Sequence, residues 1–149
     1  MTNSLPPKSL VLYADDDPDD IELIREAFDS FSQSVELVTF ADGIELLHYL
    51  DQLDPLHPSP CLIILDVNMP RLNGKELLKR LRRNENFAEV PIVLFSTSTL
   101  PSEIEFARSF DAGFVTKPLH EQQIELIIDQ LIDQCTDEVK KRIKKHRGH

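Results

Sequence analysis

Apolar and polar positions fall into blocks along this chain, and the blocks predict a regular series of strands. The apolar runs at 10–14, 61–66 and 91–96 show no alternation between apolar and polar residues. Such runs are typical of strands in a parallel sheet that is covered on both faces. The shorter runs at 35–40 and 114–116 predict two further strands, which makes five in all.

Between the strands, apolar residues recur at intervals of three and four positions, the spacing of a helix with one buried face. Pro18 suits the first position of the first helix, because an N–H there would be unpaired in any case. Three prolines within residues 54–60 exclude helix and strand from that stretch, which we interpret as a surface connection. The pattern predicts five helices, at about 18–32, 44–53, from 74 onward, 101–111 and 120–134, the last open to continuation into the C-terminal tail.

A strand followed by a helix, repeated five times, specifies the fold class. Right-handed crossovers place successive strands in a parallel sheet with helices on both faces, an α/β fold. The 149 residues suffice for one such domain. We expect a flexible N-terminus at 1–8, the domain at 9–134 and a basic tail at 135–149. Ligands of such sheets bind beyond the carboxyl ends of the strands.

Charge is distributed unevenly along the chain, whose net charge is −10. Residues 1–134 hold 10 Lys and Arg against 24 Asp and Glu, whereas residues 135–149 hold 6 against 2. An acidic body repels phosphate backbones, which argues against nucleic-acid binding by the domain itself, and we expect the tail to be solvated. No apolar run approaches the roughly 20 residues of a membrane span, and the N-terminus lacks a secretory signal. These features indicate a soluble, cytoplasmic protein.

Two further groups of residues have ordinary structural interpretations. Cys61 and Cys135 have no second cysteine or histidine at the spacing of a zinc site, so we expect structural thiols in a reducing compartment. A set of basic residues follows Gly74, and we interpret it as a solvated helix face. Its members are Lys75, Lys79, Arg80, Arg82 and Arg83.

Polar residues that carry chemistry follow four of the five predicted strands. Asp15 and Asp16 follow the first strand, Asp66 ends the third, Ser96 ends the fourth and Lys117 follows the fifth. Because carboxyl ends of parallel strands meet at one edge, these side chains are expected to converge. Carboxylates forced together repel one another unless a hard cation such as Mg²⁺ lies between them. A lysine and a hydroxyl beside such a cluster describe a site for a phosphoryl group, with an aspartate as its acceptor.

These motifs resemble the receiver domains of two-component response regulators over roughly residues 9–134. Each motif alone is weak, but their order and their positions at the strand ends are specific. The resemblance implies a flavodoxin-like fold with five helices and a doubly wound sheet of strand order 2-1-3-4-5. The motifs are Leu10-Val-Leu-Tyr-Ala-Asp-Asp-Asp-Pro18, Leu65-Asp-Val-Asn-Met-Pro70, Asn73-Gly74, Ser96-Thr97 and Gly113-Phe-Val-Thr-Lys-Pro118.

The resemblance assigns the phosphoryl acceptor and the metal ligands. It implies that Asp66 accepts the phosphoryl group and that Asp15 and Asp16 are the acidic pair that serves Mg²⁺. Asp16 would coordinate the ion directly and Asp15 largely through water. The backbone carbonyl of Asn68 would be a further ligand beside Asp66.

The resemblance also implies a switch. Lys117 would pair with the phosphoryl oxygens, Ser96 would move to hydrogen-bond them, and Phe114 would be the aromatic switch residue. Phe114 lacks the hydroxyl of the tyrosine that many relatives carry, so its inward state would depend on packing alone. Pro118 matches the family's proline that is preceded by a cis peptide bond.

Two alternative functions are weighed against this one. Asp15, Asp17, Asp19 and Glu26 occupy positions 1, 3, 5 and 12 of a calcium-binding loop, but Asp20 stands at position 6, where the sharp turn requires glycine. We instead expect Asp17, Asp19 and Asp20 to cap and charge a helix N-terminus. The other alternative is a docking module that signals without phosphorylation, and the complete set of site residues argues against it.

The sequence therefore predicts a single-domain response regulator that accepts a phosphoryl group from a sensor histidine kinase or a phosphotransfer protein. It is expected to be a signalling protein rather than an enzyme, although it would assist its own phosphorylation and dephosphorylation. About 15 residues follow the last predicted helix, so no output domain is expected. A homodimer is expected through the face of the fourth helix, fifth strand and fifth helix. The style of the motifs is similar to that of regulators associated with bacterial phytochromes.

Overall fold

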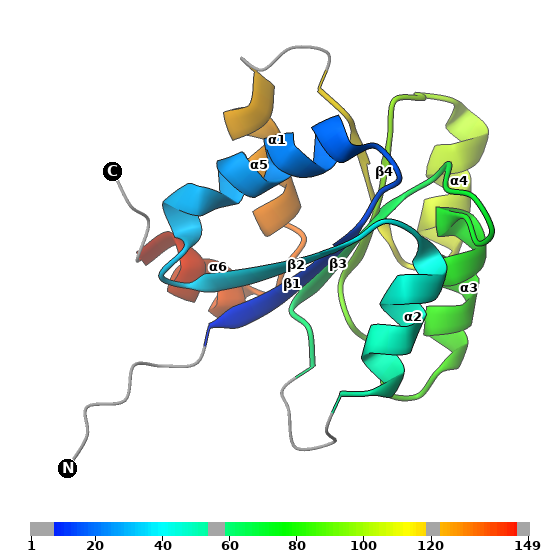
Figure 1. The fold of residues 1–149 in the computed structure, drawn as a ribbon, viewed down its shortest axis with the longest axis horizontal. Helices are drawn as coiled ribbons and strands as arrows, with labels where there is room; N and C mark the ends of the chain where they lie inside the picture. The colour runs from blue at the N-terminus through cyan, green and yellow to red at the C-terminus, as the bar shows by residue number, and fades with distance from the viewer. Residues whose placement is uncertain (1–7, 54–58, 119–122, 146–149) are drawn as a thin grey trace.

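The computed structural model describes residues 8–53, 59–118 and 123–145. Five parallel strands form one sheet in the order β2-β1-β3-β4-β5 (Figure 1). This confirms the α/β, flavodoxin-like class and the expected strand order. The strands are β1 (Ser9–Ala14), β2 (Val35–Phe40), β3 (Leu62–Asp66), β4 (Ile92–Ser96) and β5 (Gly113–Thr116).

Helices cover both faces of the sheet and make two separate core layers (Figure 1). The helices α1, α5 and α6 pack on one face, and α2, α3 and α4 pack on the other. All residues of β3 and β4 are buried, because helices cover these central strands on both sides. The helices are α1 (Pro18–Phe28), α2 (Gly43–Asp51), α3 (Gly74–Arg83), α4 (Pro101–Ser109), α5 (Ile124–Ile132) and α6 (Asp137–Lys145).

Short polar side chains fix where three of the helices begin. Asp17 caps α1 by accepting a hydrogen bond from the Asp19 N–H, with Pro18 at the first helical position. Asp42 and Asn73 cap α2 and α3 in the same way. These side chains pair N–H groups that have no partner within the helix. The interpretation of Asp17 as a cap is confirmed.

Helices α1, α2, α4 and α5 each end two or more residues before the predicted position. The α-helical part of α1 stops at Phe28, and a single 3₁₀ turn, Asp29–Phe31, completes the predicted span. Such tightening is common at helix C-termini. Helix α4 ends at Ser109, because Phe110 and Asp111 leave helical geometry and Asp111 adopts a positive φ of 54°. The predicted connection at 54–60 and the predicted flexible N-terminus at 1–8 lie mostly outside the described residues.

A sixth helix occupies part of the tail, so the described residues contain one helix more than predicted. Helix α5 ends at Ile132, and Thr136 then begins α6 by accepting hydrogen bonds from Val139 and Lys140. Ile143 is fully buried in the same core layer as α1 and α5. The expectation of a solvated tail is wrong for this segment, because α6 has an apolar side that covers the core.

Arg82 was expected on a solvated helix face, but the structure gives it a different role. Its guanidinium donates to five backbone carbonyls at 2.8–3.2 Å. A planar group with five N–H donors is suited to such an arrangement. It therefore joins the α3–β4 connection to the turn that precedes β5. The acceptors are the carbonyls of Phe87, Ala88, Val90, Phe110 and Asp111.

Arg82→Ala is expected to lower the free energy of unfolding by about 3 kcal/mol, because it leaves several carbonyls of two turns without their donor. Arg82→Lys should recover little, since one ammonium cannot reach both turns. Chemical denaturation measures both effects. The matched control is Arg80→Ala at an exposed position of the same helix, with a change within about 0.5 kcal/mol. Equal effects at the two positions would contradict this role of Arg82.

Candidate functional site

Three aspartates gather at the carboxyl end of the sheet. One carboxylate oxygen from each of Asp15, Asp16 and Asp66 lies within 4.8 Å of those of the other two. Asp15 and Asp16 follow β1, and Asp66 is the last residue of β3, its neighbour in the sheet. Asp15 and Asp66 are buried, whereas Asp16 is exposed. The cluster is therefore held by the core on one side and open to solvent on the other.

Lys117 follows β5 and brings a positive charge to this cluster. Its Nζ lies 2.8 Å from Asp15 Oδ2 and 3.3 Å from Asp66 Oδ1, and it donates a 2.9 Å hydrogen bond to Asp20 Oδ2. Burial alone would lower the pKa of Lys117, but its hydrogen bonds to Asp15 and Asp20 and the surrounding negative charge raise it above its usual value. Lys117 is therefore a fixed cation.

The site remains negative despite this lysine. Burial, followed by the charge of Asp15, raises the pKa of Asp66 to about 7, against the opposing effect of Lys117. One ammonium thus faces the carboxylates of Asp15, Asp16, Asp20 and Asp66. A set of carboxylate oxygens this close suits a hard divalent cation such as Mg²⁺, which takes oxygen ligands at 2.0–2.1 Å.

Tyr13 orients Asp15 from within the core. Its hydroxyl donates to Asp15 Oδ2 at 2.5 Å, and the Asp17 N–H donates to Asp15 Oδ1 at 2.9 Å. Burial and the charge of Asp15 raise the pKa of Tyr13, so the phenol stays a donor. Tyr13 was not predicted to be a site residue. The signal was its position two residues before Asp15 in β1, since alternate residues of a strand share a face.

Asp20 also differs from its predicted role. We expected it only to add negative charge to the first turn of α1, but its carboxylate contacts Lys117 directly. The first turn of α1 follows β1 closely. This places Asp20 over the end of the sheet, where Lys117 follows β5. Asp20 therefore belongs to the charge balance of the site.

Asn68 lies beside the cluster through its backbone. Its N–H donates to Asp66 Oδ1 at 3.4 Å, while its side chain is exposed. The β3–α3 connection thus wraps around the Asp66 carboxylate. The expectation that the Asn68 carbonyl is a metal ligand stays a prediction.

Ser96 ends β4 but does not bond to the aspartate cluster. Its hydroxyl donates to Glu103 Oε2 at 3.4 Å and accepts from the Ser98 N–H at 3.0 Å. Both Ser96 and Glu103 are buried. Glu103 was not predicted to be a site residue either, because a glutamate in the first turn of a helix is ordinarily a favourable surface charge. Here it directs the Ser96 hydroxyl toward α4.

Phe114 lies on β5, beside the strand that ends in Ser96. It is half-buried, packs against the core layer of α2, α3 and α4, and pairs with Leu94, two residues before Ser96.

The peptide bond between Lys117 and Pro118 is trans, since the described residues contain no cis peptide, so the expected cis bond is wrong here. A trans bond before proline is favoured by about 0.5–1 kcal/mol, and Lys117 reaches the carboxylates without the cis form.

Gly74 lets α3 begin directly against the acceptor strand. Its N–H donates to the Val67 carbonyl at 3.2 Å, and a Cβ there would collide with the carbonyl oxygen of Asp66. Gly74→Ala is therefore expected to destabilise the fold by about 2 kcal/mol or more in denaturant titration. In the control Gly113→Ala, the nearest obstacle is the flexible end of Gln134, so a smaller loss is expected. A larger loss for Gly113→Ala would contradict this packing.

Comparisons with known proteins place the chain in a family. The model of the response regulator receiver domain matches residues 11–129. The chain belongs to the receiver domains of response regulators. A membrane span would need a longer and more apolar helix than any found among the described residues.

The chain is similar to two regulators in particular. Response regulator Rcp1 of Synechocystis sp. is 29% identical over 100 residues, which cover 66% of this chain and 68% of Rcp1. Two-component response regulator ARR17 of Arabidopsis thaliana is 32% identical over 123 residues, which cover 77% of this chain and 79% of ARR17.

Two solved structures share the fold. The phosphorylated cyanobacterial phytochrome response regulator RcpA has a TM-score of 0.76 and 27% identity, covering 87% of this chain and 98% of its own. The Mn²⁺-bound form of Rcp1 has a TM-score of 0.72 and 25% identity, covering 84% of this chain and 95% of its own. The predicted similarity to phytochrome-associated regulators is confirmed.

Proposed function

We propose that Asp66 accepts a phosphoryl group in the presence of Mg²⁺ and that Asp15, Asp16, Asp66 and the carbonyl of Asn68 hold the ion. The observation that carries the proposal is a buried carboxylate with a raised pKa between an acidic pair and a buried lysine. The donor is a sensor histidine kinase or a phosphotransfer protein, in the cytoplasm. The solved structures of a Mn²⁺-bound relative and of a phosphorylated relative support this proposal.

The chain's own residues position the reactants. The Tyr13 hydroxyl and the Asp17 N–H fix Asp15, and the Asn68 N–H fixes Asp66. An Asp66 oxygen attacks phosphorus while the bond from phosphorus to the donor's leaving group breaks. Bound Mg²⁺ would offset the repulsion between this carboxylate and an anionic donor. Lys117 then exchanges its contact with Asp66 for one with a phosphoryl oxygen, and the same positioning assists later attack by water.

Phosphorylation would reach the surface through Ser96. To hydrogen-bond a phosphoryl oxygen, the Ser96 hydroxyl must leave Glu103. Leaving a buried carboxylate without its hydrogen bond costs free energy. Helix α4 must therefore rearrange so that Glu103 finds another partner or reaches water. Phe114 packs into the space that this creates. The changed surface is the face of α4, β5 and α5, which serves as the signalling face and as the interface of a homodimer.

Intact-mass measurement tests the phosphoryl transfer. The protein is incubated with acetyl phosphate in Mg²⁺ or in a chelator, and the modified residue is located by peptide mapping after borohydride reduction. We expect one phosphoryl group per chain, on Asp66, and only with the metal. A gain that survives chelation, or that lies on another residue, contradicts the proposal. So does the absence of any gain when both acetyl phosphate and a phosphorylated donor protein are supplied to folded protein.

The proposed dimer face carries an exposed apolar side chain. Leu126 on α5 is 63% exposed, which suits an interface. Sedimentation with a phosphoryl mimic is expected to show a larger dimer fraction, and Leu126→Glu should remove it. The control Ile44→Glu changes an exposed apolar residue on α2, which packs beside β1 and β2, at the other edge of the sheet from β5, and should leave the dimer intact. A monomer under all conditions would contradict this interface.

A further inference from the structure

Two thiols meet at the end of the sheet opposite the candidate site. Cys61 directly precedes β3, and Cys135 lies between α5 and α6. Cys61 lines the same cavity as Thr136, the residue after Cys135. Both thiols belong to the core layer that α6 completes, and each perturbs the pKa of the other. Both cysteines are free. The proposed phosphoryl chemistry uses neither of them, and two adjacent thiols can exchange two electrons as a unit.

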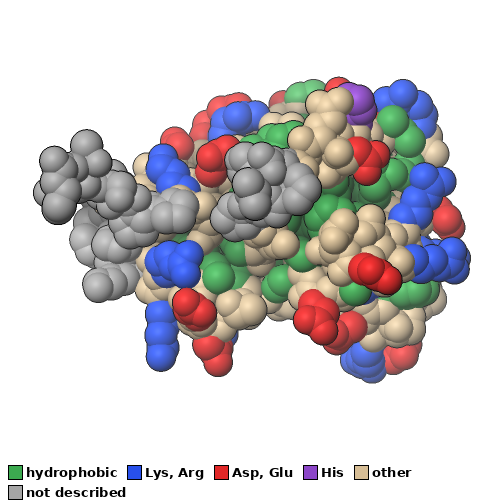
Figure 2. Space-filling model, turned by 90° about the horizontal axis from the view of Figure 1, so that it is seen from below, with side chains coloured by type: hydrophobic (Ala, Val, Ile, Leu, Met, Phe, Trp, Pro, Cys, Tyr) green, Lys and Arg blue, Asp and Glu red, His purple; other side chains and the backbone are tan. Residues whose placement is uncertain are grey.

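One of the two thiols has access to small molecules. Cys61 is half-buried and lines a cavity of about 940 Å³ at the amino ends of the strands. Figure 2 views the molecule from below Figure 1 and shows apolar side chains gathered in the middle of this side, with charged ones around them. Cys135 is buried and does not line the cavity. An oxidant in solution would therefore meet Cys61 first.

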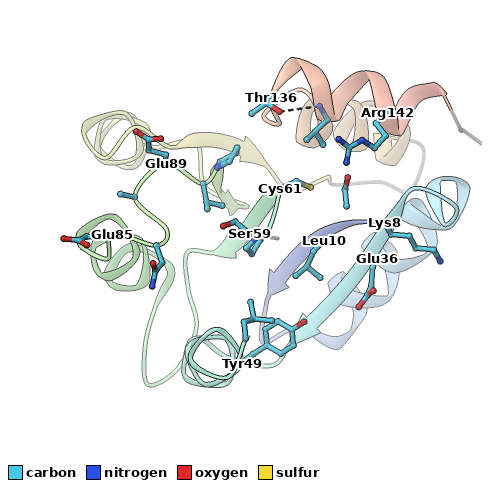
Figure 3. Close-up of a pocket in the computed structure, with 18 residues that line it drawn as sticks. Lys8, Leu10, Glu36, Tyr49, Ser59, Cys61, Glu85, Glu89, Thr136 and Arg142 are labelled. Carbon is cyan, nitrogen blue, oxygen red and sulfur yellow. Dashed lines mark hydrogen bonds between the residues drawn. The ribbon is translucent and has the colours of Figure 1, made fainter. Parts of the chain in front are cut away.

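The surroundings of Cys61 favour its reactive form. Figure 3 shows the Cys61 sulfur and the Arg142 side chain of α6 approaching the same end of the cavity. The neighbouring Cys135 thiol and the charge of Arg142 lower the pKa of Cys61, against the effect of burial. The same pairing and burial raise the pKa of Cys135. A thiolate is the nucleophile in thiol oxidation.

We propose that Cys61 and Cys135 are a redox pair that a hydroperoxide converts into an intramolecular disulfide. The Cys61 thiolate attacks a peroxide oxygen, the O–O bond breaks, and hydroxide leaves, so that Cys61 becomes a sulfenic acid. The Cys135 sulfur then attacks the Cys61 sulfur, the S–O bond breaks, and water leaves with the Cys135 proton. The two thiols lose two electrons, and hydrogen peroxide is reduced to two molecules of water.

The disulfide would join the α5–α6 connection to the start of the central strand β3. Helix α6 is attached to the core through Ile143 and Val139, so the covalent link would hold this helix on the sheet. A cross-link between distant residues also restricts the unfolded chain. The oxidised protein should unfold at a temperature higher by about 5 °C. Transient disulfides of this kind are the usual redox signal in reducing compartments.

Alkylation and mass spectrometry on the full chain test the proposal. Reduced protein is treated with hydrogen peroxide and then with iodoacetamide. We expect a mass loss of two hydrogens, no alkylation, a monomer on a non-reducing gel and full reversal by dithiothreitol. The sequence contains two cysteines, so each outcome is assigned without ambiguity. Disulfide-linked dimers, independent over-oxidation of both thiols or unchanged alkylation would each overturn the proposal.

Two single variants separate the roles of the thiols. Cys135→Ser should stop at a Cys61 sulfenic acid that dimedone traps. Cys61→Ser should lose its remaining thiol at least about 10-fold more slowly, because that thiol is buried and protonated. Equal rates in the two variants would contradict the order of attack. Asp66→Asn should oxidise like the wild type, so the outcome is independent of the phosphoryl chemistry.

Discussion

Replacing Asp66 by asparagine is expected to abolish phosphoryl acceptance and, in magnesium-free buffer at pH 8, to raise the stability of the protein. The loss of acceptance follows because an amide cannot form the acyl phosphate. The gain in stability follows because burial and Asp15 raise the pKa of Asp66 to about 7 from an ordinary value of 3.8. The folded state therefore carries a carboxylate that the unfolded chain accommodates more easily.

The sign of the pH dependence follows from that shift. A raised folded-state pKa stabilises the fold below the unfolded value, near pH 4, and this contribution is lost as the pH rises through about 7. The advantage of Asp66→Asn should grow over this window and reach about 2 kcal/mol at pH 8, allowing for solvent screening of the full shift. Thermal unfolding across pH measures it. A constant difference from pH 4 to pH 8 would contradict the assignment.

The control for both effects is Asp51→Asn, at an exposed position near the end of α2. It removes the same charge and should change neither phosphoryl acceptance nor the slope of stability with pH. Adding Mg²⁺ should narrow the stability gap between wild type and Asp66→Asn, because the cation relieves the repulsion that the substitution removes. No metal effect on the wild type would argue against an ion in this cluster.

Lys117→Met is expected to destabilise the protein by about 3–5 kcal/mol at pH 8, the usual cost of removing one partner from a buried ionic cluster. Its Nζ lies within 3.3 Å of oxygens from Asp15, Asp20 and Asp66, so its loss leaves three carboxylates without their shared cation. This loss of stability should shrink toward pH 5 as Asp66, whose pKa is raised to about 7, takes up a proton. Denaturant titrations at pH 5 and pH 8 measure it.

Lys79→Met is the matched control, since this lysine is partly exposed and its carboxylate partner, Glu76, is 3.9 Å away. Its effect should stay within about 0.5 kcal/mol. Mg²⁺ should restore part of the stability of Lys117→Met, but phosphoryl transfer should remain slow in that variant. A pH-independent loss would indicate that Lys117 acts through packing rather than through charge.

The strands could be predicted because a buried strand has a recognisable apolar pattern in the sequence. A strand with helices on both faces must be apolar throughout, and Leu62–Asp66 and Ile92–Ser96 meet that condition up to their last residue. Helix α6 was missed because its charged residues outnumber its apolar ones. The buried contact of Ile143 depends on how the segment folds back onto the core, and no local pattern specifies that return.

Some of the site residues could also be predicted from the sequence, and others could not. Aspartates at strand ends and a lysine after the last strand could be predicted, since topology alone brings them to one edge. Tyr13 was missed although it lies two residues before Asp15, and Glu103 was missed because a glutamate in the first turn of a helix is ordinarily a surface charge. Asp20 could not be predicted, because its partner Lys117 lies 97 residues away in the sequence. The role of Arg82 could not be predicted either, because its five acceptors belong to two turns that the residues around Arg82 in the sequence do not specify.

The backbone N–H of Lys117 donates to the carbonyl of Ser96 at 2.7 Å, and Ser96 pairs with Thr116 across β4 and β5. This ladder keeps the two strand ends from sliding past each other, so the Ser96 hydroxyl can change partners only by side-chain rotation. Such rotations take picoseconds to nanoseconds when unhindered, whereas the movement of a packed segment takes microseconds or longer. Under the proposed switch, the response time would therefore be set by the rearrangement of α4 that follows when Ser96 leaves Glu103, a residue of that helix. Amide protons of β4 and β5 should exchange equally slowly before and after activation.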